Sequence, residues 1–215
     1  MVMPFKYSCF ISYSGSRNRI LESFVTGFGE LLSREISLYR EGPVFWDRQR
    51  LESGEPGAGE RQTAKAICQS VCMVPVLTPL YFRSKYCMRE YVAMKMLERQ
   101  RLSMLPERGG TGLIIPIILR GAGLLPPEIT KHRQYFDFSN FVLSDAQIDR
   151  DPVYHIHIQK IADYVSKLYD AFENLPGDVS GDCSKFKLPD ENELEGWLEG
   201  VAPNAAPSVP SFPSF

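Results

Sequence analysis

Short apolar runs alternate along this chain with segments whose apolar residues recur at helical spacing. The runs cover residues 7–12, 43–47, 72–77, 113–119 and 134–138, and the helical segments between and after them lie near residues 20–32, 60–70, 84–100 and 156–172. Strands that alternate with helices are joined by helical crossovers and so lie parallel. The sequence therefore predicts an α/β fold, an open, doubly wound sandwich in which helices cover both faces of a five-stranded parallel sheet.

Charge and hydropathy argue against two classes of partner. The chain has 24 Lys and Arg against 26 Asp and Glu, a formal net charge of −2, and no basic stripe of the kind that binds nucleic acid. Its longest apolar run, residues 113–119, is far shorter than the roughly 18 residues that cross a membrane. The first ten residues lack the basic and apolar regions of a secretory signal. We expect a soluble, cytoplasmic protein that binds neither nucleic acid nor membrane.

The cysteines and histidines suggest no metal site. The five cysteines are scattered, odd in number and form no Cys-x-x-Cys pair, so neither a disulfide framework nor a zinc site is expected, and a reducing compartment fits best. Cys68 and Cys72 flank a helix-to-strand junction, where small buried hydrophobic residues explain them as well as redox chemistry does. His155 and His157 face different sides of a helix, and we expect them on its surface.

The composition changes after residue 176. Residues 190–200 contain five acidic residues and no basic one, and residues 202–215 contain four prolines among alanines and serines. Such a segment buries too little apolar surface to offset the entropy of ordering it. We expect one domain over residues 1–176, followed by a flexible tail or linker over residues 177–215.

The expected topology locates a ligand site. Ligands of open parallel sheets bind beyond the carboxyl ends of the strands where the strand order reverses, which for the flavodoxin-like order 2-1-3-4-5 lies between strands one and three. Residues 14–19 follow the first strand and offer backbone N–H groups, hydroxyls and the guanidinium groups of Arg17 and Arg19, a candidate phosphate cradle. The commoner interpretation of such a stretch is a polar surface loop with an N-capping serine. The loop with glycines at 54, 57 and 59 matches neither a dinucleotide fingerprint nor a Walker loop, and we expect it to be mobile.

Glu90 is the unusual residue near this edge. At helical spacing it shares a stripe with Cys87, Tyr91, Met94 and Leu97, which places a carboxylate on the inward face of a helix. The residues three and four positions away are not cationic, so no intrahelical ion pair accounts for it. Two interpretations stay open: a functional carboxylate, or a boundary glutamate that reaches water or a distant arginine.

Three segments together resemble the TIR (Toll/interleukin-1 receptor) domain family. YSCFISYS at 7–14 is similar to the opening box, VFWDRQRLESGEPGAGE at 44–60 to the second strand and the long loop after it, and SKYCMREY at 84–91 to the S-x-W-C-x-x-E segment. The resemblance covers residues 6–172 in order and spacing, with Tyr86 where tryptophan is usual. It points to the bacterial-type, NAD-cleaving branch of the family.

In that branch the glutamate of the third segment is catalytic in cleaving NAD⁺ between nicotinamide and ribose, and the resemblance gives this role to Glu90. Nicotinamide leaves as a neutral group, so one carboxylate suffices without a general acid. It would stabilise the oxocarbenium-like centre, hold a ribose hydroxyl or trap the sugar covalently. NAD⁺ is then a substrate, and no cofactor or metal is expected. The residues expected to bind this substrate are Phe10, Ser12, Tyr13, Ser14, Arg17, Trp46, Asp47, Tyr81, Ser84 and Cys87.

The resemblance implies an NAD⁺ glycohydrolase or cyclase that yields ADP-ribose or a cyclic ADP-ribose and acts as a defence effector. It also implies self-association through the loop at residues 51–59 and control by an upstream sensor or second domain. The alternative is a non-catalytic TIR scaffold, and a nucleoside N-glycosidase would also use a single glutamate. A phospho-acceptor receiver domain is excluded, because it needs acidic residues where this chain has Ser12-Tyr13-Ser14 and Thr78.

Overall fold

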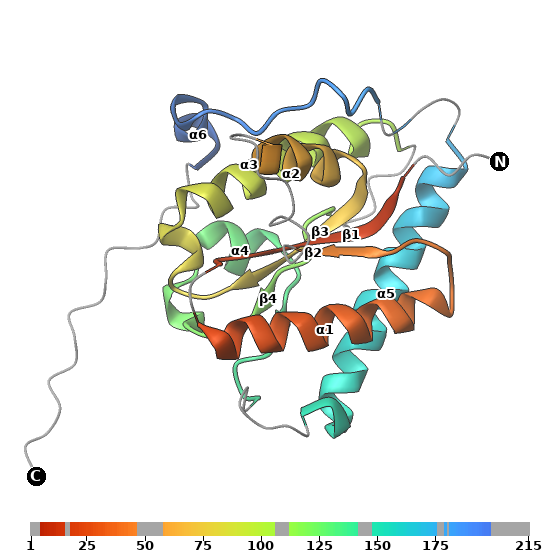
Figure 1. Cartoon of the computed structure of the whole chain (residues 1–215), viewed down its shortest axis with the longest axis vertical. Helices are drawn as coiled ribbons and strands as arrows, with labels where there is room; N and C mark the ends of the chain where they lie inside the picture. The colour runs from red at the N-terminus through yellow and green to blue at the C-terminus, as the bar shows by residue number, and fades with distance from the viewer. Residues whose placement is uncertain are drawn as a thin grey trace, which may run out of the picture.

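The chain forms a five-stranded parallel sheet with helices on both faces (Figure 1), in the strand order β2-β1-β3-β4-β5. The structure is a computed structural model that describes residues 5–15, 18–46, 58–105, 112–141, 148–175, 179 and 181–198. The strands are β1 (Tyr7–Tyr13), β2 (Val44–Trp46), β3 (Ser70–Leu77), β4 (Ile117–Ile118) and β5 (Phe136–Asp137). The predicted flavodoxin-like α/β fold and its strand order are confirmed.

The helices form one layer on each face of the sheet. Figure 1 shows α1 and α5 below the sheet in that view, and α2, α3 and α6 above it. The helices are α1 (Arg19–Ser37), α2 (Ala58–Cys68), α3 (Lys85–Leu102), α4 (Pro127–His132), α5 (Pro152–Glu173) and α6 (Glu191–Leu198), with single 3-10 turns η2 (Tyr81–Arg83), η3 (Ala122–Leu124) and η4 (Ile148–Arg150). No helix in the described part of the chain is long and apolar enough to cross a membrane.

The central strands β1 and β3 carry the core. All residues of β3 are buried, as expected for a strand covered on both faces. The predicted fourth strand, residues 113–119, is buried throughout, but only Ile117 and Ile118 are in the regular ladder. Pro116 has no N–H to donate, although its carbonyl accepts from the Phe136 N–H at 2.9 Å. The predicted fourth and fifth strands are therefore shorter in the structure than in the sequence pattern.

Short polar side chains start three of the long helices. The Asn18 Oδ1 accepts from the N–H groups of Ile20 and Leu21 at 3.0 and 3.3 Å and caps α1. Ser84 caps α3, and Asp151 caps α5 immediately before Pro152. These caps fix where each helix leaves the sheet edge.

The predictions for α5 are wrong at two positions. Ile156 was expected to face the core but is 46% exposed. His157, expected on the surface, packs its ring against Phe138 at a centroid distance of 5.1 Å, and its Nδ1 is buried. His157 lies one helical turn before the buried Ile161 and shares its face, whereas Ile156 lies about 100° further round the helix.

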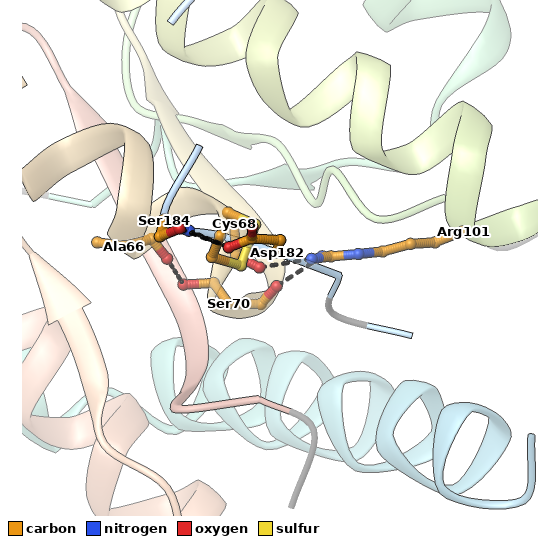
Figure 2. The surroundings of a disulfide bond; sticks show 7 residues. Ala66, Cys68, Ser70, Arg101, Asp182 and Ser184 are labelled. Atoms are coloured by element: carbon orange, nitrogen blue, oxygen red, sulfur yellow. Dashed lines mark hydrogen bonds between the residues drawn. A yellow bond between two sulfur atoms is a disulfide. The ribbon is translucent and has the colours of Figure 1, made fainter. Parts of the chain in front are cut away.

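The structure also corrects the expectation for the cysteines. Cys68 and Cys183 form a disulfide (Figure 2). Cys9, Cys72 and Cys87 are buried thiols. The two bonded cysteines are 115 residues apart and come together only through folding, so neither their spacing nor an odd total could reveal the pair. The interpretation of Cys68 as a small hydrophobic residue is wrong.

The segment after residue 176, expected to be a flexible tail or linker, is packed against the domain in its described part. Val179, Cys183, Leu188 and Leu194 are buried, and α6 packs against α3. These four apolar side chains are removed from water. Residues 199–215 lie outside the described part of the chain.

Candidate functional site

The carboxyl ends of the central strands meet beside the first turns of α3. Tyr13 at the end of β1 pairs with Val76 of β3, and Ile11 pairs with Trp46 at the end of β2. The helix α3 begins at this edge because the Ser84 Oγ accepts from the Cys87 N–H at 3.3 Å. The strand-order reversal and a helix start therefore coincide, as the topology predicts.

Glu90 lies on the sheet-facing side of α3 and is 1% exposed. The Ser12 hydroxyl of β1 donates to Glu90 Oε2 at 2.6 Å. The stripe of inward residues predicted around Glu90 is confirmed, since Cys87, Tyr91 and Met94 are also buried. A carboxylate is thus held at the switch point of the sheet by a residue of the neighbouring strand.

Tyr81 extends this hydrogen-bonded chain. Its hydroxyl lies 2.9 Å from the Ser12 Oγ, and the Tyr81 ring is fully buried. The single hydrogen of Ser12 goes to the carboxylate, so the Tyr81 O–H donates to Ser12. Burial, and to a lesser extent the charge of Cys87, raises the pKa of Tyr81 well above its usual value, so the hydroxyl stays a donor. Hydrogen bonds in such a chain strengthen one another.

Three buried polar atoms at the same edge have no hydrogen-bond partner in the part of the chain that the structure describes. They belong to residues at the ends of β1, β2 and β3, and they are the Ser14 Oγ, the Trp46 Nε1 and the Thr78 Oγ1. Buried polar groups are normally satisfied, because an unmet hydrogen bond costs about 1–3 kcal/mol. The edge of the sheet therefore offers two hydroxyls and one indole N–H that a polar ligand would satisfy.

The remaining predicted site residues divide into distinct groups. Phe10 is buried and stacks on Phe45 at a centroid distance of 5.4 Å, so its ring belongs to the core. The Tyr81 ring, expected to stack on substrate, is likewise enclosed. Tyr13 and Trp46 are only partly buried, and the Trp46 ring lies close to Gly29 of α1. The Cys87 Sγ donates to the Tyr13 carbonyl at 3.4 Å.

Parts of the predicted phosphate cradle and of the predicted assembly loop lie outside the described residues. These are Ser16 and Arg17 of the cradle and residues 51–57 of the loop at 51–59, and the predicted binding residue Asp47 also lies outside them. Within the described part, Asn18 and not a serine caps α1, and its side chain occupies two amides that a phosphate would need. Arg19 is exposed at the first position of α1.

Thr78 was placed at this edge by the sequence analysis but was assigned no binding role. The feature that could have identified Thr78 as a binding residue is its position directly after β3, the longest strand that the structure describes. A side chain at that position lies next to the point where the strand order reverses. Ser12 and Tyr81 were assigned to substrate, but the structure places their hydroxyls on Glu90 and on each other. The observed hydrogen bonds of Ser12 and Tyr81 depend on the direction in which each side chain points. A sequence motif does not specify that direction.

Comparison with protein families identifies one match, to the family described as the TIR domain, over residues 9–150. The matched region runs from β1 to η4 and includes Ser12, Tyr81 and Glu90. No curated protein matches the chain.

Proposed function

Because the chain belongs to the TIR domain family, we propose that it cleaves the bond between nicotinamide and ribose in NAD⁺, with Glu90 as the catalytic carboxylate. The observation that carries this proposal is the position of Glu90 at the strand-order reversal, where the Ser12 hydroxyl orients its Oε2 at 2.6 Å. A carboxylate at this point of a parallel sheet lies where the fold binds ligands.

Cleavage of the bond between nicotinamide and ribose requires few groups besides the Glu90 carboxylate. As the bond to nicotinamide lengthens, positive charge develops on the ribose, and a nearby carboxylate stabilises it electrostatically or forms a covalent intermediate. Water attack then gives ADP-ribose, and attack by a group of the same nucleotide gives a cyclic ADP-ribose. The Ser12 bond restricts the carboxylate to one orientation before substrate arrives, which lowers the cost of reaching the transition state.

The unsatisfied atoms at the edge suit the polar groups of a nucleotide. The Ser14 and Thr78 hydroxyls would pair with ribose hydroxyls or the carboxamide of nicotinamide, and the Trp46 Nε1 would donate to an acceptor. The partly buried rings of Tyr13 and Trp46 supply surface on which a base would stack. Arg17, Arg19 and Asp47 stay proposed ligands of the substrate, and no cofactor or metal is required.

The burial of Glu90 implies that the single chain is not in its most active state. At 1% exposure the carboxylate must be uncovered before a ribose reaches it. We propose that self-association of the domain, with the loop at residues 51–59 as the contact, supplies this rearrangement. An upstream sensor or second domain would then trigger a defence response by clustering the chain.

A non-catalytic scaffold is the second candidate function. The same low exposure of Glu90 favours it, since a fully buried and hydrogen-bonded carboxylate can serve the fold alone. In that case the chain acts only through TIR–TIR contacts.

The deciding experiment measures nicotinamide release from NAD⁺ by the purified full chain, both dispersed and clustered on a surface. We expect release that depends on Glu90 and is lost in Glu90→Gln, a substitution of nearly equal size. Glu30→Gln is the matched control, because Glu30 is an exposed carboxylate of α1. It should leave the rate unchanged.

Three outcomes exclude the proposal. A wild-type chain silent in both states favours the scaffold, and equal activity of Glu90→Gln removes Glu90 from the reaction. Cleavage of free nucleosides in preference to NAD⁺ indicates a nucleoside N-glycosidase. NADP⁺, included as a parallel substrate, defines the specificity.

A further inference from the structure

A disulfide ties the end of α2 to the segment that leads into α6. Cys68 is the last residue of α2, and Cys183 lies 115 residues further along the chain (Figure 2). The bond therefore joins the family-type domain to residues outside the matched region 9–150. We refer to residues 181–198 as the strap.

The two ends of this bond differ in rigidity. On the α2 side, the buried Arg101 guanidinium donates to the carbonyls of Cys68 and Ser70, the latter at 2.8 Å (Figure 2). On the strap side, Cys183 lies in a surface turn in which Asp182 accepts from the Ser184 N–H at 3.1 Å and pairs with Lys185 at 3.2 Å. Because that turn is exposed, its local opening brings the two sulfur atoms into contact with solvent.

The strap covers a second apolar face of α3. Met88 and Val92 are four residues apart and buried, although the sheet-facing stripe of this helix runs through Cys87, Tyr91 and Met94. The α6 part of the strap packs against α3 (Figure 1), and its Leu194 is buried. Both α6 and α2 pack against α3, so the strap covers part of the surface of α3 that does not face the sheet.

Polar contacts place the strap on the turn of α3 that carries the catalytic candidate. The Arg89 Nε donates to the Pro189 carbonyl at 2.7 Å, while the same guanidinium binds Glu60 of α2. Lys85 pairs with Glu191 at 2.6 Å. Arg89 immediately precedes Glu90 in the chain. The Arg89 side chain therefore links the strap and α2 to the turn of α3 that carries the Glu90 carboxylate.

We propose that the bond between Cys68 and Cys183 is a redox-active modification site that controls whether the strap stays closed over α3. A dithiol reductant attacks one sulfur, its second thiol resolves the mixed disulfide, and two electrons and two protons pass to the cysteines. The products are two thiols on the protein and a disulfide on the reductant. Opening of the strap then exposes Met88 and Val92 and releases Arg89 from Pro189.

Closure depends on the disulfide because the other contacts of the strap are weak. An isolated helix of eight residues is marginal in water. The ion pair of Lys85 and Glu191 is largely exposed and contributes little. Once the disulfide is reduced, the burial of Leu188 and Leu194, the packing of Phe186 and the hydrogen bond from Arg89 to the Pro189 carbonyl oppose the gain in chain entropy, and we expect the strap to open locally while the sheet stays folded.

The test is amide hydrogen exchange of the full chain, with and without dithiothreitol, read by mass spectrometry. Reduction should accelerate exchange in the strap and in the first half of α3 by at least about tenfold and leave β3 unchanged. Cys183→Ser should show the fast pattern without reductant and no further change with it. Cys9→Ala, which removes a core thiol outside the disulfide, should stay sensitive to reductant.

Two outcomes overturn the proposal. One is an intact mass showing that the native chain resists reduction at concentrations that reduce accessible disulfides. The other is a reduced chain, two hydrogens heavier, with unchanged exchange in the strap and in α3.

The effect on the active site rests on the proposed function and has a separate readout. Release of Arg89 loosens the turn that carries Glu90, so nicotinamide release should fall by about tenfold in Cys183→Ser. Faster exchange with no nicotinamide release from wild type supports the strap and refutes the proposed function. Faster exchange with an unchanged rate of release refutes the control of the site by the strap.

Discussion

At the scale of single residues, the proposed function depends on how one carboxylate is held. Ser12 donates to Glu90, and Tyr81 donates to Ser12, so two buried hydroxyls from separate segments fix the orientation of one acid. Each link is a buried hydrogen bond, and removal of either partner leaves a polar group unsatisfied. These two hydrogen bonds suit a carboxylate that must point in one direction to act on a substrate.

We predict that Ser12→Ala lowers kcat for NAD⁺ cleavage by about 10- to 100-fold and leaves KM nearly unchanged, because the carboxylate is misdirected and not removed. Steady-state kinetics under clustering conditions measure this. Ser8→Ala is the matched control, since the Ser8 hydroxyl is on the same strand and donates to the Gly42 carbonyl at 2.7 Å, away from Glu90. Equal losses in both variants would show that Ser12 acts only through stability.

The residues of the site were predictable to different degrees. Helical spacing alone places Glu90 inward, because a helix period defines a face. The alternation of β1 also places Phe10 and Ser12 on one face, but it does not say how far each lies from the sheet edge, so Phe10 was wrongly given to the substrate. The contact of Ser12 with Glu90 joins residues 78 positions apart and needs the folded sheet.

At the scale of elements, helix starts place side chains at the edge of the sheet. We predict that Ser84→Ala lowers the free energy of unfolding by about 1 kcal/mol, because the Cys87 N–H in the first turn of α3 loses its acceptor. Chemical denaturation measures the change. Ser84→Thr should recover most of it, and Ser103→Ala, at the exposed far end of the same helix, should have little effect.

Should Ser84→Ala be as stable as wild type, the cap would not determine where α3 begins. In that case packing against the sheet alone fixes the helix start.

The helix α5 gives the fold a pH dependence. Burial, and next the charge of Lys160, lower the pKa of His157 below its ordinary value of 6.5, while Asp137 and Asp151 act in the opposite direction. The folded chain therefore prefers the neutral ring more than the unfolded chain does, and its stability is full above about pH 6.5 and declines as the pH falls below that value.

We predict that the free energy of unfolding falls between pH 7.5 and pH 5.5 and that His157→Gln reduces this fall. Urea titrations at the two pH values test this, with His155→Gln on the same helix as the control. A variant with the same pH dependence as wild type would remove His157 from the explanation.

Strong local patterns predicted the elements well and weak ones poorly. The strands β1 and β3 and the helices α1, α2, α3 and α5 follow from apolar periodicity and turn residues. The helix α6 was missed, although Asp190 and Glu193 have the spacing of a capping box, and the Glu193 carboxylate accepts from the Asp190 N–H at 2.7 Å. The acidic composition of α6 suggested disorder. Its sequence does not show that it packs against α3, and this packing orders the helix.

At the scale of the whole molecule, the sheet positions the proposed site, and a disulfide joins the family-type domain to the strap outside the family match. The alternation of strands and helices indicated a doubly wound parallel sheet, and the order 2-1-3-4-5 taken for such a flavodoxin-like fold is the observed one. The disulfide was not predicted, because the proximity of Cys68 and Cys183 is created by the packing of the strap on the domain. The expected reducing compartment loses its main support, since that argument relied on the absence of a disulfide.

Self-association gives a prediction at this scale. Because Glu90 is enclosed in the single chain, the rate of nicotinamide release per molecule should be low when the protein is dilute and rise on crowding or surface clustering. Initial rates over a wide range of enzyme concentration test this. A rate strictly proportional to enzyme concentration would contradict a requirement for assembly.

The central claim is that the carboxylate of Glu90 acts on the ribose of NAD⁺. The most direct measurement is a crystal structure of the clustered chain with an NAD⁺ analogue that resists cleavage. The account predicts a Glu90 oxygen within about 3 Å of the ribose that bears nicotinamide, with Ser14, Trp46 or Thr78 bonded to the nucleotide. A dinucleotide bound elsewhere, with Glu90 still enclosed and bonded to Ser12, would contradict it.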